Sequence, residues 1–177
     1  FLPATKAISK EMLPILDKPL LHYAIEEAKS IGIKTFIFVT NINNKFPILY
    51  LSKNISLEKH LEEKSKTKTL KIIKSLTMQT KNIKLVLQKK PLGLGDAILR
   101  TKKYIKDDDF AVLLPDDLIL GKNCLKELLT VFNKKKSSVI GAMNVNKNEV
   151  NKYGIIKGTR LNTKTIKVSD LVEKPSI

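Results

Sequence analysis

The 177-residue sequence lacks several features that mark whole classes of protein. It has no tryptophan and a single cysteine, Cys124, so it cannot form an internal disulfide, which fits a reducing, cytoplasmic setting. No apolar run reaches the roughly 18 residues that a membrane-spanning helix needs, and no apolar stretch follows the first lysines as in a signal peptide. No Cys/His spacing typical of a metal site is present. We therefore expect neither a disulfide scaffold nor a membrane protein.

Arginine is also scarce, although the chain is strongly basic. Lysine and arginine total 33 against 17 acidic residues, and only Arg100 and Arg160 are arginines. A nucleic-acid-binding domain is expected to cluster its basic residues and to offer aromatic side chains for stacking. Here the lysines are spread along the chain, and the Phe and Tyr residues lie mostly in apolar runs. A compositional bias toward Lys, Ile and Asn explains the charge better, so we expect no nucleic-acid partner. A basic nucleic-acid-binding domain remains an alternative.

Apolar spacing divides the chain into alternating helices and strands. We expect helices within 19–32, 56–80, 94–105 and 125–132. We expect strands at 35–40, 83–88, 110–117 and 138–145, a loop at 41–55, and a final hairpin of 153–158 with 165–174 that turns within 159–163. This alternation predicts one domain over residues 1–177, with a doubly wound, mostly parallel α/β sheet flanked by helices. In such folds the ligand lies beyond the carboxyl ends of the strands.

The opening stretch, FLPATKAISKEMLP, is rich in proline and lysine. Lys6 and Lys10 lie in it, and Lys18 follows shortly after. Ammonium groups in such a loop either hold an anion or point into solvent, and the residues alone leave both open. Lys18 falls at a helix start, where the dipole disfavours a cation, so we expect it to be a structural or surface residue.

Polar residues follow two of the predicted strands. Asp116 and Asp117 follow an apolar run, where carboxylates either bind a hard cation such as Mg²⁺ or form a solvated turn. Gln88 precedes LGLGDA, whose glycines come just before a predicted helix and could let backbone N–H groups approach an anion. This stretch is neither the dinucleotide-binding fingerprint nor a Walker loop, so spacing alone favours a plain strand-to-helix turn.

The remaining candidates are less specific. Glu173 and Lys174 could bind hydroxyls and phosphate, but strand alternation would point them to opposite faces unless a bulge intervened, and a surface pair is the simpler interpretation. His22 and His60 show no partner pattern, and His22 is expected to be a packing or surface residue. Cys124 is expected to be a small buried residue rather than a nucleophile.

Five segments taken together are more specific than any one of them. They are LPATKAISKEMLPILDKPLLHY, QKKPLGLGDA, LLPDD, YG and VEKP, in this order. Their order and spacing resemble the bacterial UTP–glucose-1-phosphate uridylyltransferases, also called UDP-glucose pyrophosphorylases, over essentially the whole chain. The sugar-phosphate thymidylyl- and cytidylyltransferases share a looser version of the first segment.

The resemblance implies transfer of a uridylyl group from UTP to glucose 1-phosphate, with Mg²⁺ as the cofactor and pyrophosphate as the second product. It implies that Lys10 neutralises the triphosphate and the charge that develops at the α-phosphorus. It implies that Asp116 binds the Mg²⁺, with Asp117 as a weaker candidate. It also implies that Gln88 and Gly93 contact the uracil edge.

The same resemblance implies a sugar site near the end of the chain. Gly154 matches the position that lets the backbone approach the sugar, Glu173 the residue that binds glucose hydroxyls, and Lys174 the residue that binds the sugar phosphate. Lys10, Asp116 and Lys174 are the residues expected to be catalytic. A cytoplasmic homo-oligomer is expected for the full-length protein.

The chain departs from the family pattern at both ends. The Gly-rich loop G-x-G-T-R that precedes the first segment in the family does not occur here, and neither does a second metal-binding Asp beyond VEKP. We therefore expect an internal piece of a longer polypeptide that is inactive and poorly soluble by itself. A related thymidylyl- or cytidylyltransferase, and a binding module without turnover, are alternative interpretations.

Overall fold

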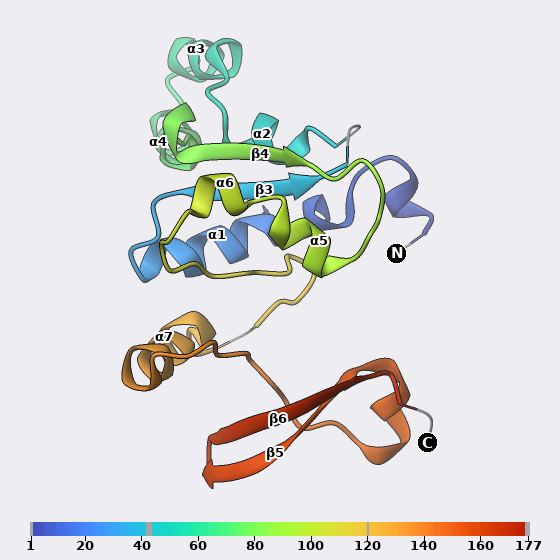
Figure 1. Cartoon of the computed structure of the whole chain (residues 1–177). Coiled ribbons are helices and arrows are strands. Elements are labelled where there is room, and N and C mark those ends of the chain that lie inside the picture. Colours follow the sequence, from blue (N-terminus) through green and yellow to red (C-terminus); the bar gives the residue numbers. More distant parts are fainter. Residues whose placement is uncertain (1, 42–43, 120, 176–177) are drawn as a thin grey trace. The chain divides into compact units, whose positions relative to one another are not determined.

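The computed structural model describes residues 2–41, 44–119 and 121–175 of the chain. The chain divides into two compact units, Phe1–Lys136 and Ser137–Ile177 (Figure 1). Unit 1 contains a parallel strand pair with helices, and unit 2 contains an antiparallel hairpin. No helix in these three described stretches is long and apolar enough to cross a membrane.

The opening segment of unit 1 contains two short 3₁₀ helices and a small hairpin, and α1 follows it. These elements are η1 (Ala4–Lys6), η2 (Lys10–Met12), β1 (Pro14–Ile15), β2 (Lys18–Pro19) and α1 (Leu20–Ser30). The remaining elements of unit 1 are β3 (Phe36–Thr40), α2 (Phe46–Leu51), α3 (Ile55–Glu63), α4 (Thr67–Leu76), η3 (Thr80–Asn82), β4 (Ile83–Leu87), α5 (Leu94–Leu99), α6 (Lys102–Ile105) and α7 (Cys124–Lys135).

Helix α1 forms as its apolar spacing predicts. Leu21, Ile25 and Ala28 recur at helical spacing, and all three are buried. Pro19 occupies the N-cap position in an extended conformation, and Gly32 follows the helix with φ of 90°. The helix predicted within 19–32 is therefore confirmed.

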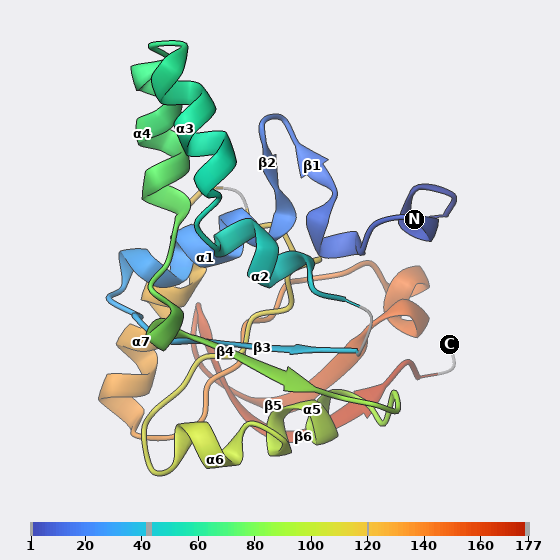
Figure 2. The same ribbon diagram turned by 90° about the horizontal axis from the view of Figure 1, so that it is seen from above.

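Strands β3 and β4 pair in parallel, from Phe36 opposite Ile83 to Thr40 opposite Leu87. The core of unit 1 is a cluster of Leu21, Ile25 and Leu51, against which Phe36, Phe38 and Ile83 of the strands pack. Figure 2 shows α1 and α2 on one face of the pair and α5 and α6 on the other. Helices thus cover both faces of a parallel sheet, as predicted for a doubly wound α/β fold.

Two predicted strands do not form. Residues 110–117 and 138–145 make no strand ladder within the part of the chain that the structure describes. Phe110 and Val112 are 58% and 46% exposed, and Met143 is 69% exposed. An apolar run predicts burial, but a strand exists only where a neighbouring segment satisfies its backbone groups. Neither run pairs with another segment among the residues that the structure describes.

The helix boundaries also differ from those predicted. The expected loop 41–55 contains α2. Pro47 does not break this helix, because it lies in the first turn, where its missing N–H costs nothing. Residues 42 and 43 of that loop lie outside the described residues. The helices predicted at 56–80 and 94–105 are each divided in two, as α3 with α4 and α5 with α6.

Unit 2 contains η4 (Lys147–Lys152) and the hairpin of β5 (Gly154–Asn162) and β6 (Thr165–Glu173). The strands pair in antiparallel register from Gly154 opposite Glu173 to Asn162 opposite Thr165, with irregularities at Lys157/Gly158 and Arg160/Asn162. The predicted hairpin is confirmed. Its turn lies at residues 163 and 164, so β5 extends further than the sequence suggested.

Candidate active site

Lys10 and Asp116 meet in unit 1. Lys10 is the first residue of η2, and its Nζ lies 2.5 Å from Oδ2 of Asp116. Asp116 sits in a turn that the hydrogen bond from the Asp117 N–H to the Leu114 carbonyl closes, with Pro115 inside it. The Pro-Asp-Asp stretch is therefore a turn, one of the two structures that the sequence allowed, and the turn directs one carboxylate to the opening segment.

The Lys10–Asp116 pair is partly open to solvent, with side chains 48% and 32% exposed. The hydrogen bond from Lys10 holds the pKa of the Asp116 carboxyl below its ordinary 3.8. An ion pair this exposed contributes only about 0–1 kcal/mol to stability. Both charges therefore remain accessible to a ligand.

The pair belongs to the part of unit 1 in which ligands bind in α/β folds. Strands β3 and β4 point toward the same edge of the sheet, and the opening segment lies beside that edge in both views (Figures 1 and 2). Crevices outside the carboxyl ends of parallel strands are the usual ligand sites of such sheets.

A second polar group follows the end of β4. The Gln88 side-chain amide donates to the Gly93 carbonyl at 3.0 Å and to Oδ2 of Asp96 at 2.8 Å. A carboxylate only accepts hydrogen bonds, so the amide nitrogen must be the atom that faces Asp96. Arg100 donates to the same oxygen at 2.7 Å. The hydrogen bond from Arg100, and then that from Gln88, lower the pKa of Asp96.

Gly93 has a conformation that favours glycine. It is the N-cap of α5, with φ of 89° and ψ of 177°. Helix α5 begins at Leu94, so Gly95 lies inside the helix rather than before it, contrary to the expectation of two glycines ahead of the helix. Gly93 is therefore the one glycine of this pair that lies ahead of α5.

In unit 2, Glu173 and Lys174 lie at the end of β6. Lys174 has φ of 45°, its N–H donates to the Tyr153 carbonyl at 3.1 Å, and its Nζ lies 3.6 Å from Oε1 of Glu173. The left-handed residue ends the strand alternation that would have put the two side chains on opposite faces. A Cβ at Gly154 would lie 3.2 Å from Oε2 of Glu173, so this glycine leaves room for the carboxylate.

The structure thus forms three groups among the predicted site residues: Lys10 with Asp116, Gln88 with Gly93, and Gly154 with Glu173 and Lys174. The first two belong to unit 1 and the third to unit 2. Lys6 is exposed, and Lys18 forms an ion pair with Glu26, consistent with the structural role expected for it.

The residues set aside as non-functional also have clear environments. His22 is buried, at 7% exposure, and His60 is exposed. Cys124 is half-buried, and burial raises the pKa of its thiol, so it lacks the character of an activated nucleophile.

Sequence reasoning missed Asp96 and Arg100, which hold the Gln88 side chain. Their spacing of four residues is the signal that could have found them, because side chains four apart on a helix are neighbours. Glu26, one partner of His22, carries the same four-residue signal, whereas Tyr50, its other partner, lies on another helix and had no such signal.

The residues present fit a Mg²⁺ ion that is held by one carboxylate together with water and nucleotide phosphates, and not one enclosed by protein ligands. No cluster of three or more His, Cys, Asp or Glu side chains suited to a metal exists among the residues that the structure describes. Mg²⁺ commonly binds through one or two carboxylates and completes its shell with water and substrate phosphates. The Asp116 carboxylate is suited to that role.

Comparison with known proteins identifies the class of protein to which the fold belongs. The family model for "Nucleotidyl transferase" matches residues 1–177, so the chain belongs to the nucleotidyl transferase family. The chain is 42% identical over 177 residues to UTP–glucose-1-phosphate uridylyltransferase YngB of Bacillus subtilis, covering 99% of this chain and 59% of that protein.

Two solved structures support the same family. UTP-bound UGPase from Acinetobacter baumannii matches with a TM-score of 0.90 at 35% identity, covering 99% of this chain and 64% of that one. A UDP-glucose pyrophosphorylase complexed with UDP-glucose matches with a TM-score of 0.80 at 36% identity, with coverage of 99% and 64%. The nucleotidyltransferase α/β fold is thereby confirmed. The chain spans about three fifths of the length of these relatives.

Proposed function

We propose that the protein containing this chain transfers the uridylyl group of UTP to glucose 1-phosphate and releases UDP-glucose and pyrophosphate. The observation that carries the proposal is the convergence of Lys10 and Asp116, 106 residues apart, beside the carboxyl edge of the parallel sheet. The likeness to relatives and structures named for this activity supports it.

In the proposed reaction a phosphate oxygen of glucose 1-phosphate forms a bond to the α-phosphorus of UTP. The bond from that phosphorus to the oxygen bridging to the β-phosphate breaks, and the electron pair leaves with pyrophosphate. The attacking oxygen is already anionic, so the reaction needs no base, and positioning with charge neutralisation supplies the catalysis. Lys10 supplies positive charge to the triphosphate and to the charge that develops on the α-phosphoryl group.

Asp116 would hold Mg²⁺, whose remaining ligands would be water and phosphate oxygens. When bound, the ion neutralises phosphate charge. The short distance between Lys10 and Asp116 places the ammonium group and the proposed metal ligand close enough to act on the same phosphates.

Gln88 and Gly93 would bind the uracil. Because the Gln88 amide nitrogen faces Gly93 and Asp96, its carbonyl oxygen is the atom that would accept the N3–H of uracil. Cytosine has no hydrogen on N3, so this contact disfavours CTP, whereas thymine shares the N3–H with uracil. The arrangement therefore favours a uridylyl or thymidylyl donor.

Gly154, Glu173 and Lys174 would bind glucose 1-phosphate. The Glu173 carboxylate would accept hydrogen bonds from sugar hydroxyls, and the Lys174 ammonium group would pair with the phosphate. Both side chains are exposed, at 74% and 60%, and their charged groups lie 3.6 Å apart, so one small ligand can reach both.

We infer that both units belong to one nucleotidyltransferase domain, because the family model spans residues 1–177. We place the protein in the cytoplasm, where UTP and sugar phosphates are available, and expect a homo-oligomer that binds neither nucleic acid nor membrane.

The test is pyrophosphate release by the product of the complete reading frame, with Mg²⁺ and a panel of nucleotides and sugar phosphates. Release is expected with UTP and glucose 1-phosphate. Faster release with dTTP or another sugar phosphate would favour the related transferase instead. Binding of UDP-glucose without any release would support a binding module. Salt-sensitive RNA binding without a sugar-nucleotide product would support the nucleic-acid alternative.

A further inference from the structure

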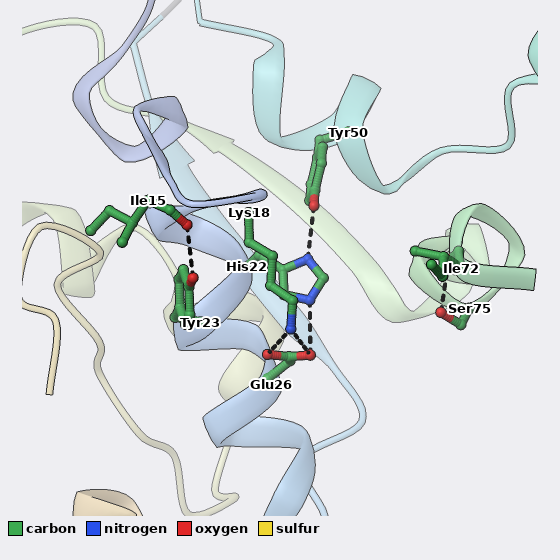
Figure 3. A network of polar contacts seen from close by, with 8 residues as sticks. All are labelled: Ile15, Lys18, His22, Tyr23, Glu26, Tyr50, Ile72 and Ser75. Atoms are coloured by element: carbon green, nitrogen blue, oxygen red, sulfur yellow. Dashed lines mark hydrogen bonds and ion pairs between the residues drawn. The ribbon is translucent and has the colours of Figure 1, made fainter. Parts of the chain in front are cut away.

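A polar network around the buried His22 lies on α1, beside the hairpin that follows the Lys10 segment (Figure 3). His22 Nε2 lies 3.0 Å from Oε1 of Glu26, and His22 Nδ1 lies 2.7 Å from the Tyr50 hydroxyl. The Glu26 carboxylate also accepts hydrogen bonds from Lys18 Nζ at 2.9 and 3.0 Å. The network therefore links β2, α1 and α2.

The direction of these hydrogen bonds follows from the chemistry of the groups. The Glu26 carboxylate only accepts, so Nε2 of His22 carries a hydrogen. In the neutral ring Nδ1 then accepts from the hydroxyl of Tyr50, and burial raises the pKa of that phenol. Burial alone would raise the pKa of Glu26, but the hydrogen bonds from Lys18 and His22 hold it below 4.5. Each donor to Glu26 is thus directed toward an ionised carboxylate.

The network and its neighbour Tyr23 attach both strands of the β1–β2 hairpin to α1. Lys18 of β2 binds Glu26, and the Tyr23 hydroxyl donates to the Ile15 carbonyl of β1 at 2.8 Å. Each strand has only two residues, and a hairpin this short is not stable by its own pairing. The side chains of α1 therefore supply much of what holds it in place.

The hairpin is continuous with the segment that carries Lys10. Met12, the last residue of η2, packs against the core cluster that contains Leu21. The next residue, Leu13, accepts a hydrogen bond at its carbonyl from the Leu20 N–H at 3.1 Å. A displacement of the hairpin would therefore displace η2, and with it the Lys10 ammonium group.

We propose that His22 and Glu26 are positioning residues that hold the β1–β2 hairpin on α1 and thereby keep Lys10 at the Asp116 carboxylate. The consequence for turnover rests on the proposed function, whereas the position of Lys10 can be tested without it. His22 acts through Glu26 and the hairpin, because its ring is buried and both its nitrogens are engaged.

The pKa of Asp116 measures the position of Lys10, because Lys10 is the main cause of its lowering. The experiment follows the Asp116 carboxyl carbon by NMR during an acid titration, with the signal assigned from Asp116→Asn. In His22→Ala we expect the pKa of Asp116 to rise toward 3.8. His22→Gln retains a donor near the Nε2 position, so it should keep the pKa low. His22→Asn retains only the contact to Tyr50 and should not.

Two further variants keep the inference falsifiable. Tyr23→Phe removes only the hydroxyl that binds Ile15, with no change of charge, and should also raise the pKa of Asp116. This variant replaces His22→Ala as the test if His22→Ala fails to fold. Leu61→Ala creates a cavity at a buried position on α3 and should leave the pKa of Asp116 unchanged while it lowers stability. An unchanged Asp116 pKa in folded His22→Ala and in Tyr23→Phe, or an equal rise in Leu61→Ala, would overturn the proposal.

Kinetics provide the second readout. In the product of the complete reading frame, His22→Ala should lower kcat about 10- to 100-fold, with a smaller change in KM for UTP, and His22→Gln should restore most of kcat. A structural role alone would lower the melting temperature without this rescue of kcat. If the parent protein itself shows no turnover, the proposed function fails, while the Asp116 titration still decides the positioning inference.

Discussion

The Lys10 ammonium group lies 2.5 Å from a carboxylate oxygen of Asp116, a residue 106 positions further along the chain. The two residues come from a 3₁₀ helix and from a turn. Neither helix periodicity nor strand register brings them together, so their meeting is a property of the tertiary fold. Because an exposed pair adds little stability, its interest lies in what the two charges can bind.

Replacement of Lys10 tests the proposed role of the pair. In the product of the complete reading frame, Lys10→Ala should lower kcat for pyrophosphate release about 100- to 1,000-fold, because a positive charge aimed at the reacting phosphates is lost. Lys59→Ala is the control, since Lys59 is 76% exposed and its ion pair with Glu63 is long, at 3.9 Å. Turnover of Lys10→Ala at the parent rate would contradict the mechanism.

Acid unfolding should reveal the same pair. The pKa of Asp116 is lower in the folded chain than its ordinary 3.8, so the pair stabilises folding above that pH and loses this contribution as pH falls through the folded pKa. Lys10→Met should therefore be less stable than the parent by up to about 1 kcal/mol at pH 6. The difference should shrink as denaturant unfolding is repeated toward pH 3. A difference that is constant over this range would place its origin elsewhere.

Two glycines at the start of α5 offer a matched pair of alanine substitutions. Gly93→Ala should cost about 1–3 kcal/mol, because φ of 89° with ψ of 177° belongs to a region that only glycine occupies readily. Gly95→Ala should stabilise the chain by up to about 1 kcal/mol, because this residue is helical and nothing lies within 4 Å of an added Cβ. Urea unfolding measures both, and shifts of the same sign would show that backbone conformation is not the cause.

Unit 2 provides a second pair. A Cβ at Gly158 would collide with the backbone carbonyl oxygen of Lys167, so Gly158→Ala should separate the strands of the hairpin. At Gly154 the nearest atom is the flexible end of the Glu173 side chain, and Gly154→Ala should keep the hairpin paired. Amide hydrogen exchange in β6 should accelerate only in Gly158→Ala. Intact protection in that variant would contradict the observed register.

Helix α7 depends on a side chain from α1. The Leu125 N–H in the first turn of α7 donates to Oε1 of Glu27 at 2.9 Å, so Glu27 satisfies a donor that a helix leaves unpaired. Glu27→Ala should cost about 0.5–2 kcal/mol and accelerate amide exchange at the start of α7. Glu62→Ala, on an exposed face of α3, should leave amide exchange at the start of α7 unchanged and should not cause this loss of stability. Equal effects of the two substitutions would point to net charge as the cause.

Local elements could be predicted because their signals lie within a few residues. The buried spacing of Leu21 and Ile25 indicated α1, and β-branched and aromatic runs indicated β3 and β4. The runs at 110–117 and 138–145 carried the same signal without becoming strands. Pairing depends on a neighbour that the run itself does not encode, so periodicity could not separate these cases.

Candidate site residues were predictable one at a time, but their environments were not. Gln88 was a plausible base contact from its place after a strand, yet the orientation of its amide follows from Asp96. Glu26, four residues after His22 on α1, could have been found from helical spacing, but Tyr50 lies 28 residues away on another helix. Hydrogen bonds of this kind depend on how helices pack, which spacing along one helix does not specify.

By itself, the sequence determined the α/β class, the α1 helix, the parallel pair and the final hairpin, because periodicity and turn residues act over short distances. The order of its five diagnostic segments also indicated the nucleotidyltransferase family. Only the tertiary structure decided that Lys10 meets Asp116, that the charged groups of Glu173 and Lys174 lie close together, and that His22 joins Glu26 to Tyr50. These relationships join atoms from separate elements or depend on one backbone angle, and the spacing of residues along one element specifies neither.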